Sequence, residues 1–220
     1  MPAKNSIKTY VENGFYHLYN RGVEKRQIFM NHQDYVVFLS FLKRYLTPLP
    51  KDLNEVRPPW RSDLHEKLQL TGYCLMPNHF HLMIKQFSKT AITEFMRALM
   101  NSYVKYFNKK YNRIGTLFQG RYKGVLVDTE PYLLHLTRYI HLNPTELGFT
   151  RSDLVEYKYS SYKEFLGERQ TSWVHPEEVL QYFKTARRTN LKDILSYQSF
   201  VEDYQGDSAA ILENLTLEDS

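Results

Sequence analysis

The sequence predicts an α+β fold in which one antiparallel sheet carries helices packed on one of its faces. The chain contains short apolar stretches typical of strands and longer stretches whose apolar residues recur at helical spacing. The two kinds of stretch alternate along the chain. Their order is strand, helix, strand, strand, helix, strand, helix. A single sheet with one layer of helices is the economical packing of that order, and it resembles the ferredoxin-like or RRM-like arrangement.

The first half of the chain supplies three of the predicted strands. Residues 15–22 alternate between apolar and polar and end on a turn signal, and residues 34–46 have apolar positions at helical spacing. Four of the nine prolines fall within residues 47–67, which predicts a long surface loop. Residues 69–76 and 79–86 then predict two strands, joined at Pro77 because proline cannot donate to a strand ladder.

The second half supplies the remaining elements. Apolar residues recur every three or four positions from 92 to 107 and predict a long helix, and 117–127 predicts the last strand. A third helix is expected from a cap at Asp128 or Thr129 to about residue 143, where Pro144 stops it. We expect residues 1–145 to form the main domain, 146–200 a C-terminal extension with a helix near 176–184, and 201–220 an acidic, flexible tail.

Composition is that of an ordinary globular protein, with 42% hydrophobic and 24% charged residues. No apolar run approaches the roughly 18 residues that a membrane-spanning helix needs, and the first residues lack the apolar centre of a signal peptide. These features predict a cytoplasmic protein without a membrane partner. The single cysteine, Cys74, lies in an apolar strand and is expected to be a buried, inert thiol.

The net charge of +5 is unevenly distributed along the chain. The last 19 residues contain six acids and no Lys or Arg, so the other 201 residues combine all 29 basic residues with 18 acids and carry +11. A basic body favours a polyanionic partner, most simply nucleic acid, on which some of the 31 Tyr and Phe rings can stack. The alternative is a solvated basic surface with most rings in the core.

The most informative pattern is His79-Phe80-His81 within the third predicted strand. Side chains alternate along a strand, so the two imidazoles share one face while Phe80 points into the core. Such a pair suits metal binding, although many such pairs are ordinary surface or core-edge histidines. Zinc would require a third His, Cys or carboxylate nearby, whereas Mg²⁺ or Mn²⁺ accepts two histidines, an amide oxygen and water.

The third predicted helix offers that amide oxygen together with a phenol. Tyr139 and Asn143 are four residues apart and therefore share a helix face. With the two histidines they suggest attack by the Tyr139 phenol on a metal-bound phosphate. The alternative is a core-edge tyrosine. His135, one turn earlier, is best interpreted as an ordinary surface histidine.

Candidate phosphate contacts are basic or amide side chains near the ends of predicted elements. They are Asn20, Arg21, Lys109, Lys110, Arg113, Arg121, Tyr122 and Lys123.

Four sequence blocks resemble those of the REP-associated tyrosine transposases. Residues 72–82 (GYCLMPNHFHL) look like the HUH motif of single-tyrosine transposases, and 16–22, 118–122 and 139–144 resemble three further blocks. The resemblance runs in order over residues 10–167. It implies an RRM-like catalytic domain over residues 1–145, with Tyr139 as nucleophile and His79, His81 and Asn143 as ligands of Mg²⁺ or Mn²⁺.

The implied activity is metal-dependent nicking and rejoining of single-stranded DNA, beside a hairpin, through a 5′-phosphotyrosine intermediate. In related insertion-sequence transposases the third ligand is often Gln, so Asn143 puts the ligand geometry in question. Other hypotheses are a domesticated hairpin-binding protein without turnover, a nuclease that uses water, and an RRM-like RNA binder. Nucleoid association is expected, and a homodimer is left open.

Overall fold

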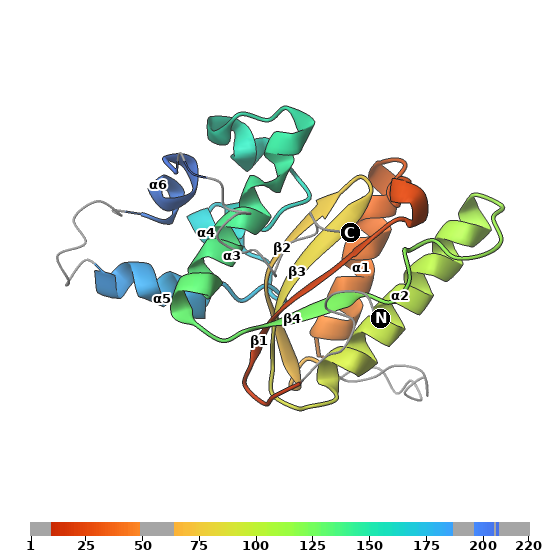
Figure 1. Cartoon of the computed structure of the whole chain (residues 1–220), viewed down its shortest axis with the longest axis horizontal. Coiled ribbons are helices and arrows are strands. Elements are labelled where there is room, and N and C mark those ends of the chain that lie inside the picture. Colours follow the sequence, from red (N-terminus) through yellow and green to blue (C-terminus); the bar gives the residue numbers. More distant parts are fainter. Residues whose placement is uncertain (1–9, 49–63, 187–195, 205, 207–220) are drawn as a thin grey trace.

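A four-stranded antiparallel sheet forms the centre of the computed structural model, which describes residues 10–48, 64–186, 196–204 and 206. Its strands are β1 (Phe15–Arg21), β2 (Leu68–Met76), β3 (His79–Gln86) and β4 (Lys123–Val127), in the order β2-β3-β1-β4 (Figure 1). The predicted α+β class is confirmed. Strand β4 is shorter than expected, because the chain before it forms only an isolated bridge between Phe118 and Gly22.

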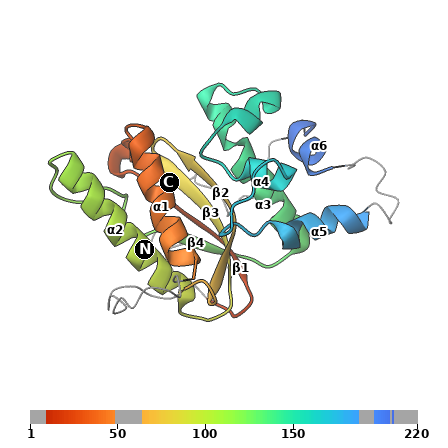
Figure 2. The same cartoon turned by 180° about the vertical axis from the view of Figure 1, so that it is seen from behind.

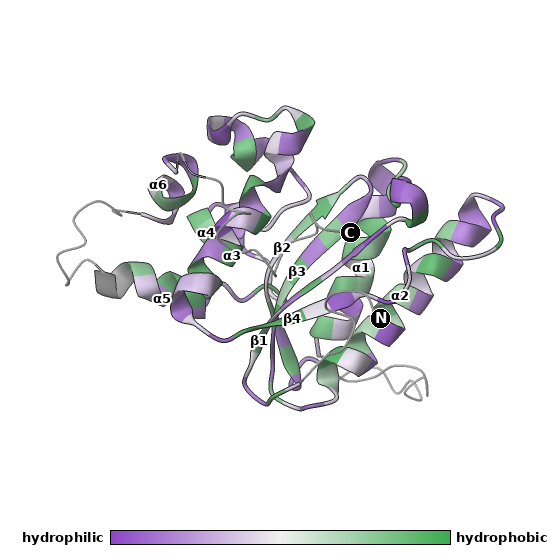
Figure 3. Ribbon diagram, in the orientation of Figure 1, coloured by the Kyte–Doolittle hydropathy of each residue, from purple (hydrophilic) through white to green (hydrophobic). Residues whose placement is uncertain are grey.

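Two long helices cover one face of the sheet, as predicted. Helices α1 (His32–Leu46) and α2 (Ala91–Lys110) lie together on the same side (Figures 1 and 2). Both show hydrophobic and hydrophilic stretches in turn, as helices with one buried side do (Figure 3). Every second residue of the central strands joins their core: Tyr16, Leu18, Phe80, Leu82 and Ile84.

The opposite face is covered by α3 (Glu130–Leu142) and by the C-terminal extension, which includes α4 (Tyr162–Leu166), α5 (Glu177–Ala186) and α6 (Tyr197–Glu202). Short 3₁₀ turns at Val23–Lys25, Asn143–Leu147 and Arg151–Glu156 connect the main elements. Helix α3 does not join α1 and α2, because its buried side packs on the other strand face. That second core includes Leu133, Leu136, Ile140, Met76 and Met83.

The extension also covers the outer edge of β2. The Leu75 amide donates to the carbonyl of Tyr159 at 2.9 Å, and the Tyr73 amide donates to Ser161 Oγ at 2.8 Å. Farther along, the His175 amide donates to the Leu70 carbonyl at 2.8 Å. An edge strand left open would expose unpaired backbone groups, so these bonds close the sheet on this side.

Several other expectations have definite outcomes. Helix α5 confirms the helix expected near 176–184, and Cys74 is fully buried, which raises the pKa of its thiol well above the ordinary value. Most of the 47–67 loop and nearly all of the acidic tail lie outside the described residues. Among the residues that are described, no helix is both long and apolar enough to cross a membrane.

A buried carboxylate ties α1 to α2. Asp34 is fully buried and accepts hydrogen bonds from the Met30 amide at 2.8 Å, Tyr111 Oη at 2.7 Å and Tyr106 Oη at 2.9 Å, and it pairs with Lys110 Nζ at 2.6 Å. Burial alone would raise the pKa of Asp34. The hydrogen bonds from Lys110, Tyr111, Met30 and Tyr106 outweigh burial and lower that pKa below its ordinary value.

We expect Asp34→Asn to lower the free energy of unfolding at pH 7 by about 3 kcal/mol, because the amide nitrogen faces donors and Lys110 loses its counter-charge. Since the native pKa of Asp34 is depressed, its contribution is present above the ordinary value and is lost as pH falls below about 4. Urea denaturation at pH 7 and pH 3 measures both effects. The exposed Asp128→Asn is the control, and equal stability of Asp34→Asn and wild type at pH 7 would contradict the assignment.

Candidate active site

Strand β3 holds two buried histidines on the face opposite to α1 and α2. His79 and His81 are 7% and 0% exposed, while Phe80 between them lies in the core of the other face. The two imidazole rings are 5.0 Å apart between centroids and nearly perpendicular. Because β3 lies between β2 and β1, hydrogen bonds on both sides fix its backbone. The predicted alternation is confirmed.

Helix α3 brings the predicted tyrosine and amide to these histidines. Asn143 directly follows the helix, and its Nδ2 donates to the Tyr139 carbonyl at 2.8 Å, the contact expected from a spacing of four residues. Asn143 Oδ1 lies 3.2 Å from His79 Nε2. The ring of Tyr139 meets His81 edge-on, with centroids 5.3 Å apart. One chain therefore assembles all four residues.

Both ring nitrogens of His79 face amide oxygens. Nδ1 lies 2.6 Å from Asn78 Oδ1, and Nε2 faces Asn143 Oδ1. Each amide is held in that orientation because its nitrogen donates to a carbonyl, of Lys25 for Asn78 and of Tyr139 for Asn143. Burial, with a smaller contribution from the nearby charge of Arg21, lowers the pKa of His79 to about 4. The ring is therefore neutral at pH 7 and has one proton for two acceptors.

The shorter contact, to Asn78, takes that proton. The Nε2 lone pair of His79 then faces the lone pairs of Asn143 Oδ1. These lone pairs repel each other unless a cation binds both atoms. His81 adds a third such atom: within the described part of the chain, its buried Nε2 has no hydrogen-bond partner. A buried polar atom without a partner is costly and calls for an explanation.

The donor set consists of two imidazole nitrogens and one amide oxygen. This set fits a divalent cation such as Mg²⁺ or Mn²⁺ with water or phosphate oxygens completing its coordination. Among the described residues, no group of three His, Cys, Asp or Glu side chains is placed to hold a metal ion. The site therefore has the mixed donors that the sequence pattern predicted.

A third histidine, His17 in β1, belongs to the same cluster and was missed as a site residue by sequence reasoning. It is fully buried, and its Nε2 lies 2.8 Å from His81 Nδ1. The available signal was the alternation of β1, which places His17 on one strand face. Only the pairing of β1 with β3 shows that this is the face that carries His81.

Two of the expected phosphate contacts flank the histidines. Arg21 is directly opposite His79 in the β1–β3 pairing, and Lys123 is opposite Tyr19 in the β1–β4 pairing. Strand alternation puts both basic side chains on the face that carries His79 and His81. The sheet thus brings two cations to the border of the histidine cluster.

Two other expected contacts make hydrogen bonds or an ion pair within the protein. Asn20 is buried, donates to the Gly120 carbonyl at 3.3 Å and accepts from the Arg21 amide at 2.9 Å, so it fastens the end of β1. Lys110 is held by the buried Asp34. Tyr122, which is partly buried, bonds through its hydroxyl to that of Tyr10 at 2.6 Å.

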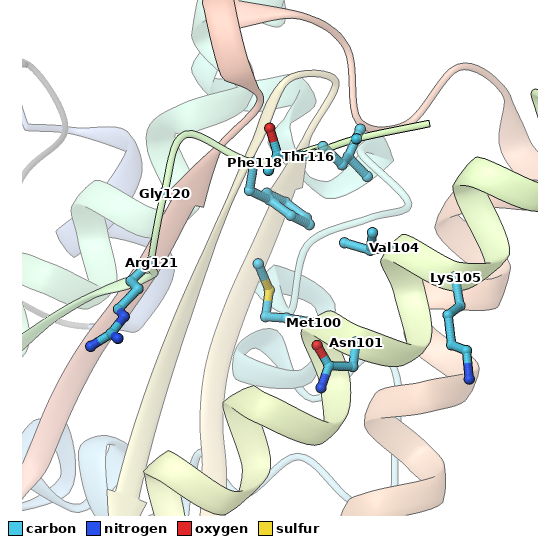
Figure 4. A pocket seen from close by; sticks show the side chains of 10 residues that line it. Met100, Asn101, Val104, Lys105, Thr116, Phe118, Gly120 and Arg121 are labelled. Atoms are coloured by element: carbon cyan, nitrogen blue, oxygen red, sulfur yellow. The ribbon is translucent and has the colours of Figure 1, made fainter. Parts of the chain in front are cut away.

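Three further candidates lie near α2. Arg121 lines a cavity of about 690 Å³ between α2 and the segment before β4, whose apolar wall includes Met100, Val104 and Phe118 (Figure 4). The exposed Lys109 and the half-buried Arg113 lie at the end of α2 and just beyond it.

Two histidines near the site have structural surroundings. His135 contacts Arg138, whose guanidinium lies over the Tyr204 ring at 3.3 Å. His141 is buried, with Nδ1 2.6 Å from Tyr197 Oη and Nε2 2.8 Å from Ser161 Oγ. His135 is thus half-buried against the C-terminal segment, and His141 fastens the end of α3 to the extension.

Residues 60–143 match the family model described as Transposase IS200 like. The matched segment covers less than half of the chain. It contains His79, His81, Tyr139 and Asn143, and the match agrees with the resemblance of the sequence blocks to transposases. None of the curated proteins matches the chain.

One solved structure resembles most of this fold. A structure of a REP-associated tyrosine transposase bound to a REP hairpin has a TM-score of 0.51 at 13% identity, covering 77% of this chain and 95% of that one. At that identity the likeness shows the fold alone. A transposase candidate from Deinococcus radiodurans R1 is 15% identical over 64% of this chain and 95% of its own, with a TM-score of 0.38 that carries no argument.

The buried histidines of this fold predict acid sensitivity. Burial lowers the pKa of His141 to about 3, that of His79 to about 4 and that of His81 well below its ordinary value. As pH falls below about 6.5, these histidines become protonated in the unfolded chain while they stay neutral in the folded one. Each histidine then lowers the free energy of unfolding by up to about 1.4 kcal/mol per pH unit.

Urea denaturation between pH 7 and pH 5 measures this slope. We expect His141→Phe to be less stable than wild type at pH 7, because Tyr197 and Ser161 lose their partner, yet to lose stability less steeply on acidification. Parallel stability curves for the variant and wild type would contradict the assignment.

Proposed function

We propose that this chain is a metal-dependent endonuclease and strand transferase for single-stranded DNA that forms a 5′-phosphotyrosine intermediate. The observation that supports it most directly is the convergence of His79 Nε2, Asn143 Oδ1 and the unpartnered His81 Nε2 beside the Tyr139 ring. A purely structural histidine cluster would satisfy its nitrogens with hydrogen-bond donors. Here the arrangement suits a cation.

In this proposal His79 Nε2, His81 Nε2 and Asn143 Oδ1 hold Mg²⁺ or Mn²⁺. When bound, such an ion polarises a phosphate and offsets the charge that builds up on it. The surrounding fold supports the role, because Asn78 and the Tyr139 carbonyl fix the orientations of His79 and Asn143.

Tyr139 acts as the nucleophile. Its Oη forms a bond to phosphorus while the bond from phosphorus to the 3′-oxygen breaks, so the 3′-oxygen leaves as a hydroxyl and the 5′-phosphate stays on the enzyme. The phenolic proton passes to water and the departing 3′-oxygen takes one up from water, so the exchange balances in protons. Attack by a 3′-hydroxyl on the phosphotyrosine reverses the exchange, so strands are nicked and rejoined without an external energy source.

Arg21 and Lys123 are proposed to hold the phosphates next to the scissile one. Their support is their position on the histidine-bearing face. Arg121, Lys109 and Arg113 are proposed as contacts for a more distant part of the DNA, along the α2 side of the sheet. The net charge of +11 outside the acidic tail favours such an extended contact.

Hairpin DNA is the proposed substrate. It is suggested by the sequence blocks and by the similar fold of a REP-associated transposase that is described as bound to a REP hairpin. A hairpin-binding protein without turnover is the alternative. The same labelled DNA distinguishes the two, since only the enzyme becomes covalently attached to it.

We expect Tyr139→Phe to abolish formation of the covalent protein–DNA adduct, because no hydroxyl remains to attack phosphorus. Hairpin DNA from the native flanking sequence, labelled downstream of the cut, is incubated with Mg²⁺ or Mn²⁺ and run on a denaturing gel. Tyr132→Phe is the matched control, since Tyr132 lies on the same helix with its ring 41% exposed.

Wild type and Tyr132→Phe should give a slow, protease-sensitive labelled band that Tyr139→Phe lacks. Cleavage that persists in Tyr139→Phe would assign the attack to water or to another tyrosine. Tight binding without any cleavage by wild type would favour the non-catalytic binder.

We expect Arg21→Gln and Lys123→Gln each to weaken DNA binding and to reduce the slope of log K against log salt by about 1, because each removes one phosphate contact. The exposed Lys43→Gln on α1, across the sheet, should leave the slope unchanged. Fluorescence anisotropy over a salt series gives the slopes. Equal slopes for all three variants would remove Arg21 and Lys123 from the interface.

A further inference from the structure

His17 and His81 share one proton between two buried nitrogens. Their rings lie 21° from coplanar, with centroids 5.0 Å apart, and the bond from His17 Nε2 to His81 Nδ1 is 2.8 Å long. Both side chains are fully buried. A neutral imidazole carries its proton on one nitrogen only, so in this bond one ring donates and the other accepts.

The direction of this hydrogen bond determines what His81 presents on its other side. If His17 donates, His81 keeps its proton on Nε2 and cannot use that atom as a metal ligand. If His81 donates from Nδ1, its Nε2 presents a lone pair. Within the described residues that Nε2 has no hydrogen-bond partner, so an N–H there would be a buried donor without an acceptor.

We propose that His17 is a positioning residue that accepts the Nδ1 proton of His81 and thereby presents the Nε2 lone pair of His81 to the metal ion. This inference rests on the metal site of the proposed function. His17 does not contact the ion in this arrangement. It acts through His81 by fixing both the tautomer and the orientation of that ring, as the partners of metal-binding histidines commonly do.

A packing role alone is the competing explanation. The His17 ring lies 4.7 Å from the ring of Tyr19 and 6.3 Å from that of Tyr139, between centroids. A residue that only fills this space could be replaced by another ring of similar size. A residue that accepts a proton needs an acceptor atom near the position of Nε2. Substitution of His17 by Phe keeps a ring without an acceptor atom, whereas substitution by Gln keeps an acceptor atom without a ring.

The test is Mn²⁺ binding by the full-length protein in the absence of DNA, measured by titration calorimetry. We expect His17→Phe, which keeps a ring but no acceptor, to bind Mn²⁺ about 10- to 100-fold more weakly than wild type. His17→Gln places an amide oxygen near the position of Nε2 and should restore most of the affinity. His79→Ala, which removes a proposed ligand, is the reference for loss of the site.

Tyr16→Phe is the matched control. Tyr16 is the neighbour of His17 in β1, is equally buried on the opposite face, and accepts one hydrogen bond from the Val11 amide at 2.7 Å. This variant loses the hydrogen bonds of the Tyr16 hydroxyl without touching His81. Its Mn²⁺ affinity should equal that of wild type, and circular dichroism should show that every variant is folded.

The outcomes separate the inference from the proposed function. If His17→Phe binds Mn²⁺ as tightly as wild type while His79→Ala does not, the metal site stands and the role of His17 is overturned. If Gln and Phe weaken binding equally, the acceptor is not what matters, which also overturns it. Absence of Mn²⁺ binding by wild type at millimolar concentration would overturn both proposals.

A second readout needs no metal. Long-range ¹H–¹⁵N correlation spectra of imidazole-labelled, metal-free protein report which nitrogen of His81 carries the proton. We expect the proton on Nδ1 in wild type, with assignment by comparison to a His81→Gln sample. A proton on Nε2 would overturn the inference whatever the metal affinity.

Discussion

The register of β3 is the constraint on which the rest of the structure depends. Phe80, Leu82 and Ile84 are buried against α1 and α2, so a slip of one residue would turn this apolar set out of that core and move both histidines into it. The hydrophobic effect on one face therefore determines where His79 and His81 lie on the other. Because side chains alternate along β3, one face of this strand stabilises the core and the other face positions the two histidines.

The second face is closed by elements that must be placed as accurately as β3. Helix α3 carries Tyr139, and its end is fastened by His141, whose ring bonds to Ser161 and Tyr197. Ser161 in turn holds the Tyr73 amide at the edge of β2. A continuous chain of buried contacts thus links α3 to the sheet through the C-terminal extension. Such support is what a site needs when its reacting groups come from separate elements.

The sequence alone predicts much of this molecule because many signals are local. The periods of the strands and helices, Pro77 and the spacings of His79–His81 and Tyr139–Asn143 are local patterns. The elements that they predict are present, and these elements bring the four residues together. The roles of His17, Asn20 and Lys110 depend on partners that are 64, 100 and 76 residues away. The side of the sheet on which α3 packs is likewise decided by contacts between distant elements.

The site and the core make opposite demands on the same fold. Burial of neutral histidines and of lone pairs without donors costs stability, which the large apolar core between the sheet, α1 and α2 offsets. A site already satisfied by hydrogen bonds would be more stable, but its nitrogens would be protonated or occupied. Because the supporting groups, Asn78, the Tyr139 carbonyl and His17, bond to the far sides of the donor residues, they orient them while leaving the donor atoms without protons. The cost of burying these donor atoms is therefore a direct consequence of their preorganisation.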